Sequence, residues 1–452
     1  MTSSSFVWAA VLAAPTREEE WAKTILAALA IGLGLYSLYT RFSKKPDPIF
    51  QAATAPGQPE TPADRQIRAA QGAIERLPDA AAGYNLLAIA FMQKARETGD
   101  FSVNARAEAA IKRSLELAPG NQEATRLHAY LLLSYHRFGE AHEVARRAVE
   151  QDPRDYEAYG ALTDSLVELG RYDEARKSVQ AMLDLRPYTA SYARASYLRS
   201  LYGNTEGAIE AMRLAVQSAN PANPENIAWC LVHLGDELMT AGRRDEAEQQ
   251  YDRALYAFPD YYLALAAKAR ARVAAGDTDA AVGFYTRSLE RVPEPAVAAE
   301  FGNLLTKLGR ADEAKRQYDL VEFVESQGGA AGAETYSRQL ALFWADRGTK
   351  LDEALALAKR ERAARADIYT SDVLAWCLFK KGQLPEARAE IEQALRLGTK
   401  DPRLHYHAGM IYHALGDRQN AARHLKLALE TNAAFDVLEA DAARRTLESV
   451  MA

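Results

Sequence analysis

The sequence has little cysteine and no cluster of basic residues. Only Cys230 and Cys377 occur among 452 residues, and no C-x-x-C pair is present, so neither a disulfide framework nor a thiolate metal site is predicted. The formal net charge is -6, and the lysines and arginines are interspersed with acidic residues. Because phosphate binding needs a clustered positive surface, no nucleic-acid partner is expected.

Motifs of common enzyme classes are also missing. The sequence holds no G-x-S-x-G, no H-E-x-x-H and no P-loop. Its many carboxylates fall on the polar faces of predicted helices, where they are expected to be solvated. We therefore predict no catalytic residue and no cofactor, and we expect that the protein is not an enzyme.

Residues 24–40 form the longest uncharged run. The run is close to the minimum for a transmembrane helix, which rises ~1.5 Å per residue through a hydrocarbon core of ~30 Å. Trp21, Tyr36 and Tyr39 lie where interfacial aromatics are expected, and Arg41 follows where a signal peptide would have small residues. We predict a single-pass membrane protein with an uncleaved anchor. A cleaved signal peptide and a soluble helix are the alternatives.

The predicted anchor divides the N-terminal region into a tail, residues 1–23, and a proline-rich linker, residues 41–62. Two basic residues precede the anchor closely and three follow it. This difference gives a weak bias toward a cytoplasmic body and leaves the side of the membrane undetermined.

Prolines recur at a fixed spacing in the rest of the chain. Pro119, Pro153 and Pro187 are 34 residues apart, as are Pro259 and Pro293. A constant period of this length is typical of a helical solenoid.

The stretch from Leu231 to Pro259 shows the pattern of one period. Its first helix carries L-x-x-L-G-x-x-L from Leu231 to Leu238, and its second carries A-x-x-x-Y from Ala247 to Tyr251. This pattern resembles the tetratricopeptide repeat family, of the membrane-anchored bacterial type. The resemblance covers roughly residues 81–433, or about ten units.

The resemblance implies an all-α fold: a right-handed α-solenoid of about ten helix-turn-helix repeats behind an N-terminal single transmembrane helix. We expect a first part of the solenoid at 63–326 and a degenerate repeat at 327–366. The last repeats are expected at 367–433, followed by a C-terminal capping helix at 434–452.

Small residues recur at the position of Gly235, where they are expected to let two helices approach closely. The set comprises Ala88, Ala129, Gly235, Ala269, Gly302, Ala375 and Gly409. A larger side chain such as leucine at Gly235 is expected to overpack this contact.

In tetratricopeptide repeat proteins the first helices of successive units line a concave groove that holds a peptide or partner segment. By register, the residue after each packing position looks into the groove. The predicted groove residues are Tyr130, Asp164, Tyr197, Asp236, Arg270, Asn303, Trp376 and Met410. The leading hypothesis is a membrane-tethered scaffold that binds a protein or peptide partner. Formation of a homo-oligomer is compatible with this hypothesis.

Two alternatives come from other functional classes. One is an accessory or regulatory subunit that binds a small molecule or glycan at the degenerate repeat. The other is a metal-handling protein that uses His405, His407, His413 and His424. Because a metal site needs three or four converging ligands and these histidines form no i,i+4 pair, no metal ligand is predicted.

Overall fold

The computed structural model describes residues 48–50, 60–330 and 337–452. The chain divides into two compact units, residues 1–52 and residues 53–452. The first unit is described only at the short 3-10 helix η1 (Pro48–Phe50). In the second unit every regular element described is a helix.

The elements of the first half of the second unit are α2 (Pro62–Arg76), α3 (Ala81–Thr98), η2 (Phe101–Val103), α4 (Asn104–Leu117), α5 (Gln122–Ser134), α6 (Phe138–Gln151), α7 (Tyr156–Glu168), α8 (Tyr172–Leu185), α9 (Thr189–Leu201), α10 (Thr205–Gln217), α11 (Pro224–Thr240) and α12 (Arg244–Ala257). The second half contains α13 (Tyr262–Ala274), α14 (Thr278–Arg291), α15 (Pro295–Lys307), α16 (Ala311–Ala330), α17 (Ser337–Arg347), α18 (Leu351–Ala364), α19 (Ile368–Lys380), α20 (Leu384–Ala394), α21 (Pro402–Ala414), α22 (Arg418–Thr431) and α23 (Glu439–Met451).

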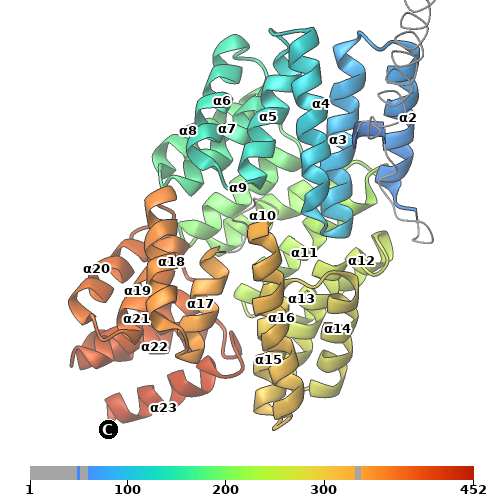
Figure 1. Ribbon diagram of the computed structural model, residues 1–452. Coiled ribbons are helices and arrows are strands. Elements are labelled where there is room, and N and C mark those ends of the chain that lie inside the picture. Colours follow the sequence, from blue (N-terminus) through green and yellow to red (C-terminus); the bar gives the residue numbers. More distant parts are fainter. Residues whose placement is uncertain (1–47, 51–59, 331–336) are drawn as a thin grey trace, which may run out of the picture. The chain divides into compact units, whose positions relative to one another are not determined.

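Consecutive helices pack as pairs, from α3 with α4 to α21 with α22 (Figure 1). This gives ten pairs, preceded by α2 and followed by α23. The first helices of neighbouring pairs also contact each other, as α11 does with α13 and α19 with α21. The predicted all-helical repeat architecture is therefore confirmed.

Local sequence signals explain where the helices end. After α11, Gly242 has a φ of 73°, a left-handed conformation that glycine adopts without steric cost. The backbone N–H of Arg243 then donates to the carbonyl of Leu238 at 2.8 Å and closes the helix end. After α12, Phe258 is extended because it precedes Pro259.

The two helices of a pair approach closely at the small residues found in the sequence. A Cβ atom at Gly235 would overlap the ring of Tyr251, and one at Gly302 would overlap the ring of Tyr318. The Tyr251 side chain is almost fully buried. The tyrosine of the second helix thus fills the space that the glycine of the first helix leaves open.

Residues far apart in the sequence also meet within this unit. The backbone N–H of Ala366 donates to the Glu168 carbonyl at 2.9 Å, and that of Ile368 donates to the Tyr172 hydroxyl at 2.9 Å. The Arg365 guanidinium is paired with the Glu168 carboxylate at 2.5 Å. These contacts tie α7 and α8 to the connection between α18 and α19.

The degenerate region contains a regular helix pair, α17 with α18. The sequence looks irregular there because α16 is extended to Ala330, which lengthens the spacing before the next pair. Residues 331–336 lie outside the described residues. The domain boundaries given above stay predictions.

The predicted membrane location is contradicted. Within residues 48–50, 60–330 and 337–452, no helix is both long and apolar enough to cross a bilayer. The long helices there carry charged residues: α3 has Lys94, Arg96 and Glu97 within its last turns. The predicted anchor at 24–40 itself lies outside the described residues.

Replacing Gly235 with alanine tests the close contact with Tyr251. We expect a loss of about 1–3 kcal/mol in the free energy of unfolding, because the new methyl group must displace a buried ring. Urea unfolding followed by circular dichroism measures this loss.

Gly283→Ala is the matched control. Gly283 lies within α14, and a Cβ atom there meets no other atom within 4 Å. Alanine is a better helix former by up to about 1 kcal/mol, so this variant is expected to be as stable as the wild type or more so. Equal stability of both variants would contradict the packing account.

Candidate functional site: two pockets on the inner helices

The eight predicted groove residues all lie on first helices of their pairs, namely α5, α7, α9, α11, α13, α15, α19 and α21. Four of them line two pockets. Asp164 and Tyr197 line a pocket between α9 and α11, and Asp236 and Arg270 line a pocket between α11 and α15. We call these the α9–α11 pocket and the α11–α15 pocket.

The α9–α11 pocket has a volume of about 450 Å³ and a largely apolar wall. Ala193 and Tyr197 come from α9, Met212 from α10 and Trp229 from α11. Tyr197 is 42% exposed. The Trp229 ring contacts the His233 ring, with 4.0 Å between the centroids. Aromatic side chains of this kind provide much of the binding energy in protein interfaces.

Two acidic side chains of this pocket already have cationic partners. The Arg194 guanidinium binds the two carboxylate oxygens of Asp164 at 2.8 and 2.6 Å. The Arg96 guanidinium, from α3, lies 3.6 Å from the Glu225 carboxylate. Glu225 also accepts a hydrogen bond from the Tyr261 hydroxyl at 3.2 Å.

Glu237 is the exception among the acids of the pocket. No ion pair to its carboxylate is formed by the part of the chain that the structure describes, and the Ser200 hydroxyl donates to it at 3.1 Å. Burial raises the pKa of Glu237 to about 7, because the charged form loses hydration that no nearby cation replaces. The pocket therefore holds one half-buried carboxylate without a counter-charge.

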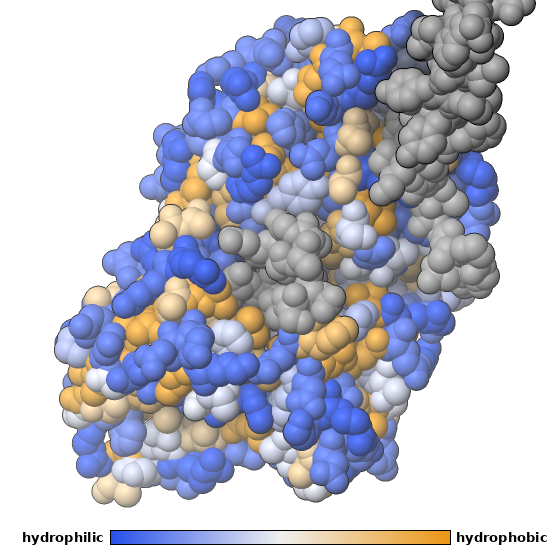
Figure 2. Space-filling view, viewed as in Figure 1, coloured by the Kyte–Doolittle hydropathy of each residue, from blue (hydrophilic) through white to orange (hydrophobic). Residues whose placement is uncertain are grey.

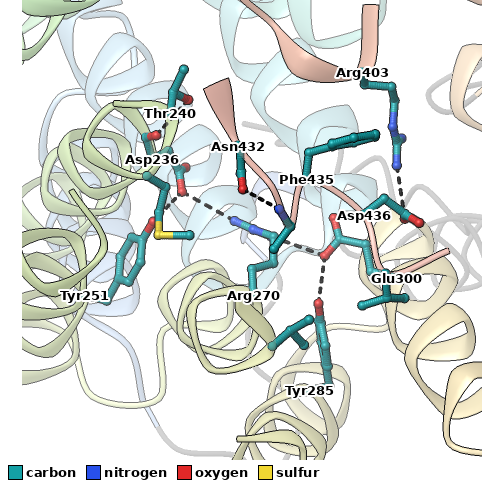
Figure 3. A pocket seen from close by; sticks show the side chains of 14 residues that line it. Asp236, Thr240, Tyr251, Arg270, Tyr285, Glu300, Arg403, Asn432, Phe435 and Asp436 are labelled. Carbon is teal, nitrogen blue, oxygen red and sulfur yellow. Dashed lines mark hydrogen bonds and ion pairs between the residues drawn. The ribbon is translucent and has the colours of Figure 1, made fainter. Parts of the chain in front are cut away.

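The α11–α15 pocket is smaller, about 240 Å³, and its charges are paired (Figure 3). Arg270 lies between Asp236, at 3.5 Å, and Glu300, at 3.4 Å. The Tyr251 hydroxyl donates to Asp236 at 2.9 Å, and the Tyr285 hydroxyl donates to Glu300 at 3.3 Å.

A C-terminal segment of the chain, residues 432–437, forms one wall of this second pocket (Figure 3). Asp436 accepts hydrogen bonds from Asn303 at 3.3 Å and from Arg403 at 3.4 Å. The Lys307 ammonium donates to the Val437 carbonyl at 3.1 Å. Since the polar groups of the α11–α15 pocket serve the chain itself, the α9–α11 pocket is the stronger candidate for a partner.

The other predicted groove residues have structural contacts. The Tyr130 hydroxyl donates to the Glu157 carbonyl at 2.9 Å, and Met410 is half-buried against the core. Trp376 is 2% exposed, and its indole N–H donates to Asp346 at 2.7 Å. The expectation that Trp376 faces an open groove is therefore corrected: its ring stacks on His407 of α21, and its indole N–H donates to Asp346 of α17.

The four C-terminal histidines do not converge. His405 and His424 form a pair with 2.9 Å between their Nδ1 atoms, and His413 is exposed. His407 lies apart from them, with its Nδ1 atom 2.8 Å from the Asp372 carboxylate. A metal site built from these histidines alone has no geometric support.

Trp229 and Glu237 were not among the predicted groove residues. With His233 they lie at i, i+4 and i+8 of α11 and so share one helix face. This spacing of an aromatic and an acid was visible in the sequence. The absence of a cation beside Glu237 was not visible in the sequence, because it depends on which side chains the other helices place near this carboxylate.

Comparison with known families agrees with this architecture. One model of the tetratricopeptide repeat matches residues 132–196, and a second matches residues 233–294 and 373–437. The chain thus contains tetratricopeptide repeats. Repeats of this family form extended concave binding surfaces and indicate a protein that binds protein partners.

Curated relatives match part of the chain. DnaJ homolog subfamily C member 3 of Rattus norvegicus is 26% identical over 200 residues, which cover 42% of this chain and 40% of the relative. The tetratricopeptide repeat and J domain-containing co-chaperone DNJ1 of Fusarium oxysporum is 27% identical over 201 residues, or 43% and 38% of the two chains. The match thus spans about two fifths of each relative's length.

Solved structures are more distant in sequence. The human IFIT1 dimer with PPP-AAAA is 16% identical, with a TM-score of 0.47 over 74% of this chain and 78% of that one. The tetratricopeptide repeat protein TTC0263 of Thermus thermophilus is 19% identical, with a TM-score of 0.36 over 46% and 100%. At these identities the likeness concerns the fold alone.

Replacing Glu237 with glutamine tests whether the carboxylate is half-buried without a counter-charge. The folded-state pKa of Glu237, about 7, exceeds the ordinary value of 4.5, so its ionisation destabilises the native state as pH rises from about 4.5 to 7. We expect Glu237→Gln to raise the thermal midpoint at pH 8 and to raise it much less at pH 5.

Glu290→Gln is the control, since Glu290 is an exposed carboxylate on α14. Its midpoint is expected to follow the wild type at both pH values. A Glu237→Gln variant that is less stable than the wild type at pH 8 would show that the carboxylate has a partner.

Proposed function

We propose that this tetratricopeptide repeat protein is an interaction scaffold that binds an extended segment of a protein partner in the α9–α11 pocket. The segment carries an apolar side chain next to a lysine or arginine. The observation that supports this proposal is Glu237, a half-buried carboxylate without a counter-charge in a pocket whose other carboxylates are paired and whose wall is largely apolar.

Desolvation favours binding of a cation at Glu237. A carboxylate removed from water without a cation is costly, and a bound ammonium or guanidinium restores a favourable environment for the charged form. Asp164 and Glu225 are already paired with Arg194 and Arg96, so an arriving cation finds one open acceptor. The pocket therefore selects for one basic group.

The apolar half of the pocket supplies the remaining specificity. Trp229, Tyr197 and Met212 form a wall that favours an aliphatic or aromatic side chain. A volume of about 450 Å³ accommodates two side chains of a peptide. One relative bears the name co-chaperone, a class of protein that acts on other proteins, which agrees with a protein ligand.

A displayed library of random peptides tests the proposal on residues 60–452. We expect enrichment of sequences that place lysine or arginine beside an apolar residue. Trp229→Ala and Glu237→Gln are each expected to weaken binding of an enriched peptide by about tenfold or more, as measured by fluorescence anisotropy.

Tyr256→Ala is the matched control, because Tyr256 is a 91% exposed aromatic on the second helix α12. It should bind as the wild type does. Because Glu237→Gln is expected to be more stable at pH 8, its loss of affinity cannot be ascribed to unfolding. Enriched peptides without a basic residue, or full affinity in both pocket variants, would overturn the proposal.

A further inference from the structure

Three side chains from three helices lie close together outside the α9–α11 pocket. Asp346 of α17, His407 of α21 and Glu439 of α23 each offer one ligand atom, and these atoms lie within 4.8 Å of one another. We propose that these three side chains bind a divalent transition-metal ion, with Zn²⁺ as the ion that fits, and that this ion fastens α23 to the inner helices.

The orientation of His407 is fixed for this role. Its side chain is fully buried, and its Nδ1–H donates to the Asp372 carboxylate at 2.8 Å. Its ring stacks on Trp376, with 4.1 Å between the centroids and 16° between the planes. A carboxylate on the far nitrogen is the usual partner of a metal-binding histidine, because it sets the ring and frees Nε2.

The free nitrogen of His407 points at the proposed ion. Its Nε2 atom is buried and makes no hydrogen bond to any residue in the described part of the chain. The nearest carboxylate oxygen of Glu439 is 3.8 Å away, too far for a hydrogen bond. A buried polar atom without a partner costs free energy, and coordination would remove that cost.

The charge around the site also calls for a cation. Four carboxyl groups gather here, those of Asp346, Asp372, Asp436 and Glu439. Even with His407 counted as a cation, they face only two further cationic groups among the described residues, the guanidinium of Arg403 and the ammonium of the half-buried Lys380. Acids therefore exceed bases, and a divalent ion would balance the excess.

The donor set selects the class of ion. One imidazole nitrogen with two carboxylate oxygens suits Zn²⁺, which takes such ligands at about 2.0–2.2 Å with water in the fourth position. Mg²⁺ and Ca²⁺ prefer oxygen-only sets of six or more ligands. Arg403 lies 3.2 Å from one oxygen of Glu439, Oε2, which leaves Oε1, on the His407 side, for the ion.

Coordination by Glu439 would have a mechanical consequence. Glu439 is the first residue of α23, and Asp436 accepts from the backbone N–H groups of Leu438 and Glu439 just before it. The ion would hold this helix end, together with the wall segment 432–437 of the α11–α15 pocket, against α17 and α21.

The test uses the full chain purified without a histidine tag and stripped with a chelator. Isothermal titration with Zn²⁺ is expected to give one equivalent of tight binding, whereas Mg²⁺ gives none. Glu439→Gln, Asp346→Asn and His407→Gln are each expected to weaken Zn²⁺ binding at least tenfold. Glu448→Gln, an exposed carboxylate on the same helix, is the control and should bind as the wild type does.

Hydrogen exchange of the wild type gives a second readout that needs no variant to fold. We expect Zn²⁺ to slow exchange in α23 and in segment 432–437. Absence of stoichiometric Zn²⁺ binding, unchanged binding in the three ligand variants, or unchanged exchange in α23 would each overturn the proposal.

Discussion

Tyr251 lies across the backbone of Gly235, and this contact joins the packing of the repeats to the polarity of their inner surface. The ring fills the space that the missing side chain leaves, while the hydroxyl reaches past it to the Asp236 carboxylate at 2.9 Å. Tyr318 repeats the arrangement over Gly302, and its hydroxyl donates to Asn303 at 3.0 Å. The tyrosine hydroxyl thus orients the side chain that follows each glycine, Asp236 or Asn303, and supplies one of its hydrogen bonds. Figure 2 shows one face of the molecule, on which hydrophilic residues predominate and apolar ones are interspersed.

Contacts between distant repeats determine which of the acidic side chains on the first helices have a cationic partner. Glu168 meets Arg365 across nearly 200 residues of sequence, and Glu225 meets Arg96 from α3. Such ion pairs add little to the free energy of folding by themselves. A carboxylate that is removed from water without a cationic partner lowers the stability of the fold. Glu237 is left in that state at the α9–α11 pocket, which is why this pocket, rather than the paired α11–α15 pocket, is assigned to a partner.

The repeat pattern predicted the fold because its signals are local. Packing within one helix pair depends on Gly235 and Tyr251, which are in contact in the structure. The first helix ends at Gly242, which has a left-handed backbone. The groove register located Asp164 and Tyr197 at the pocket for the same reason. It failed for Trp376, whose burial depends on a neighbouring pair, and it could not reveal the contact between Asn303 and Asp436, which are 133 residues apart. Such contacts join residues from distant repeats, and the pattern within one period does not encode them.

Photo-crosslinking tests the central claim, that a partner segment binds between α9 and α11. A photoreactive phenylalanine replaces either Tyr197, in the pocket, or Tyr256, on the second helix α12, and each protein is irradiated with a peptide enriched from the library. The account predicts a crosslink from position 197 that maps beside the basic residue of the peptide, and none from position 256. Equal crosslinking at both positions, or crosslinking at 256 alone, would contradict it.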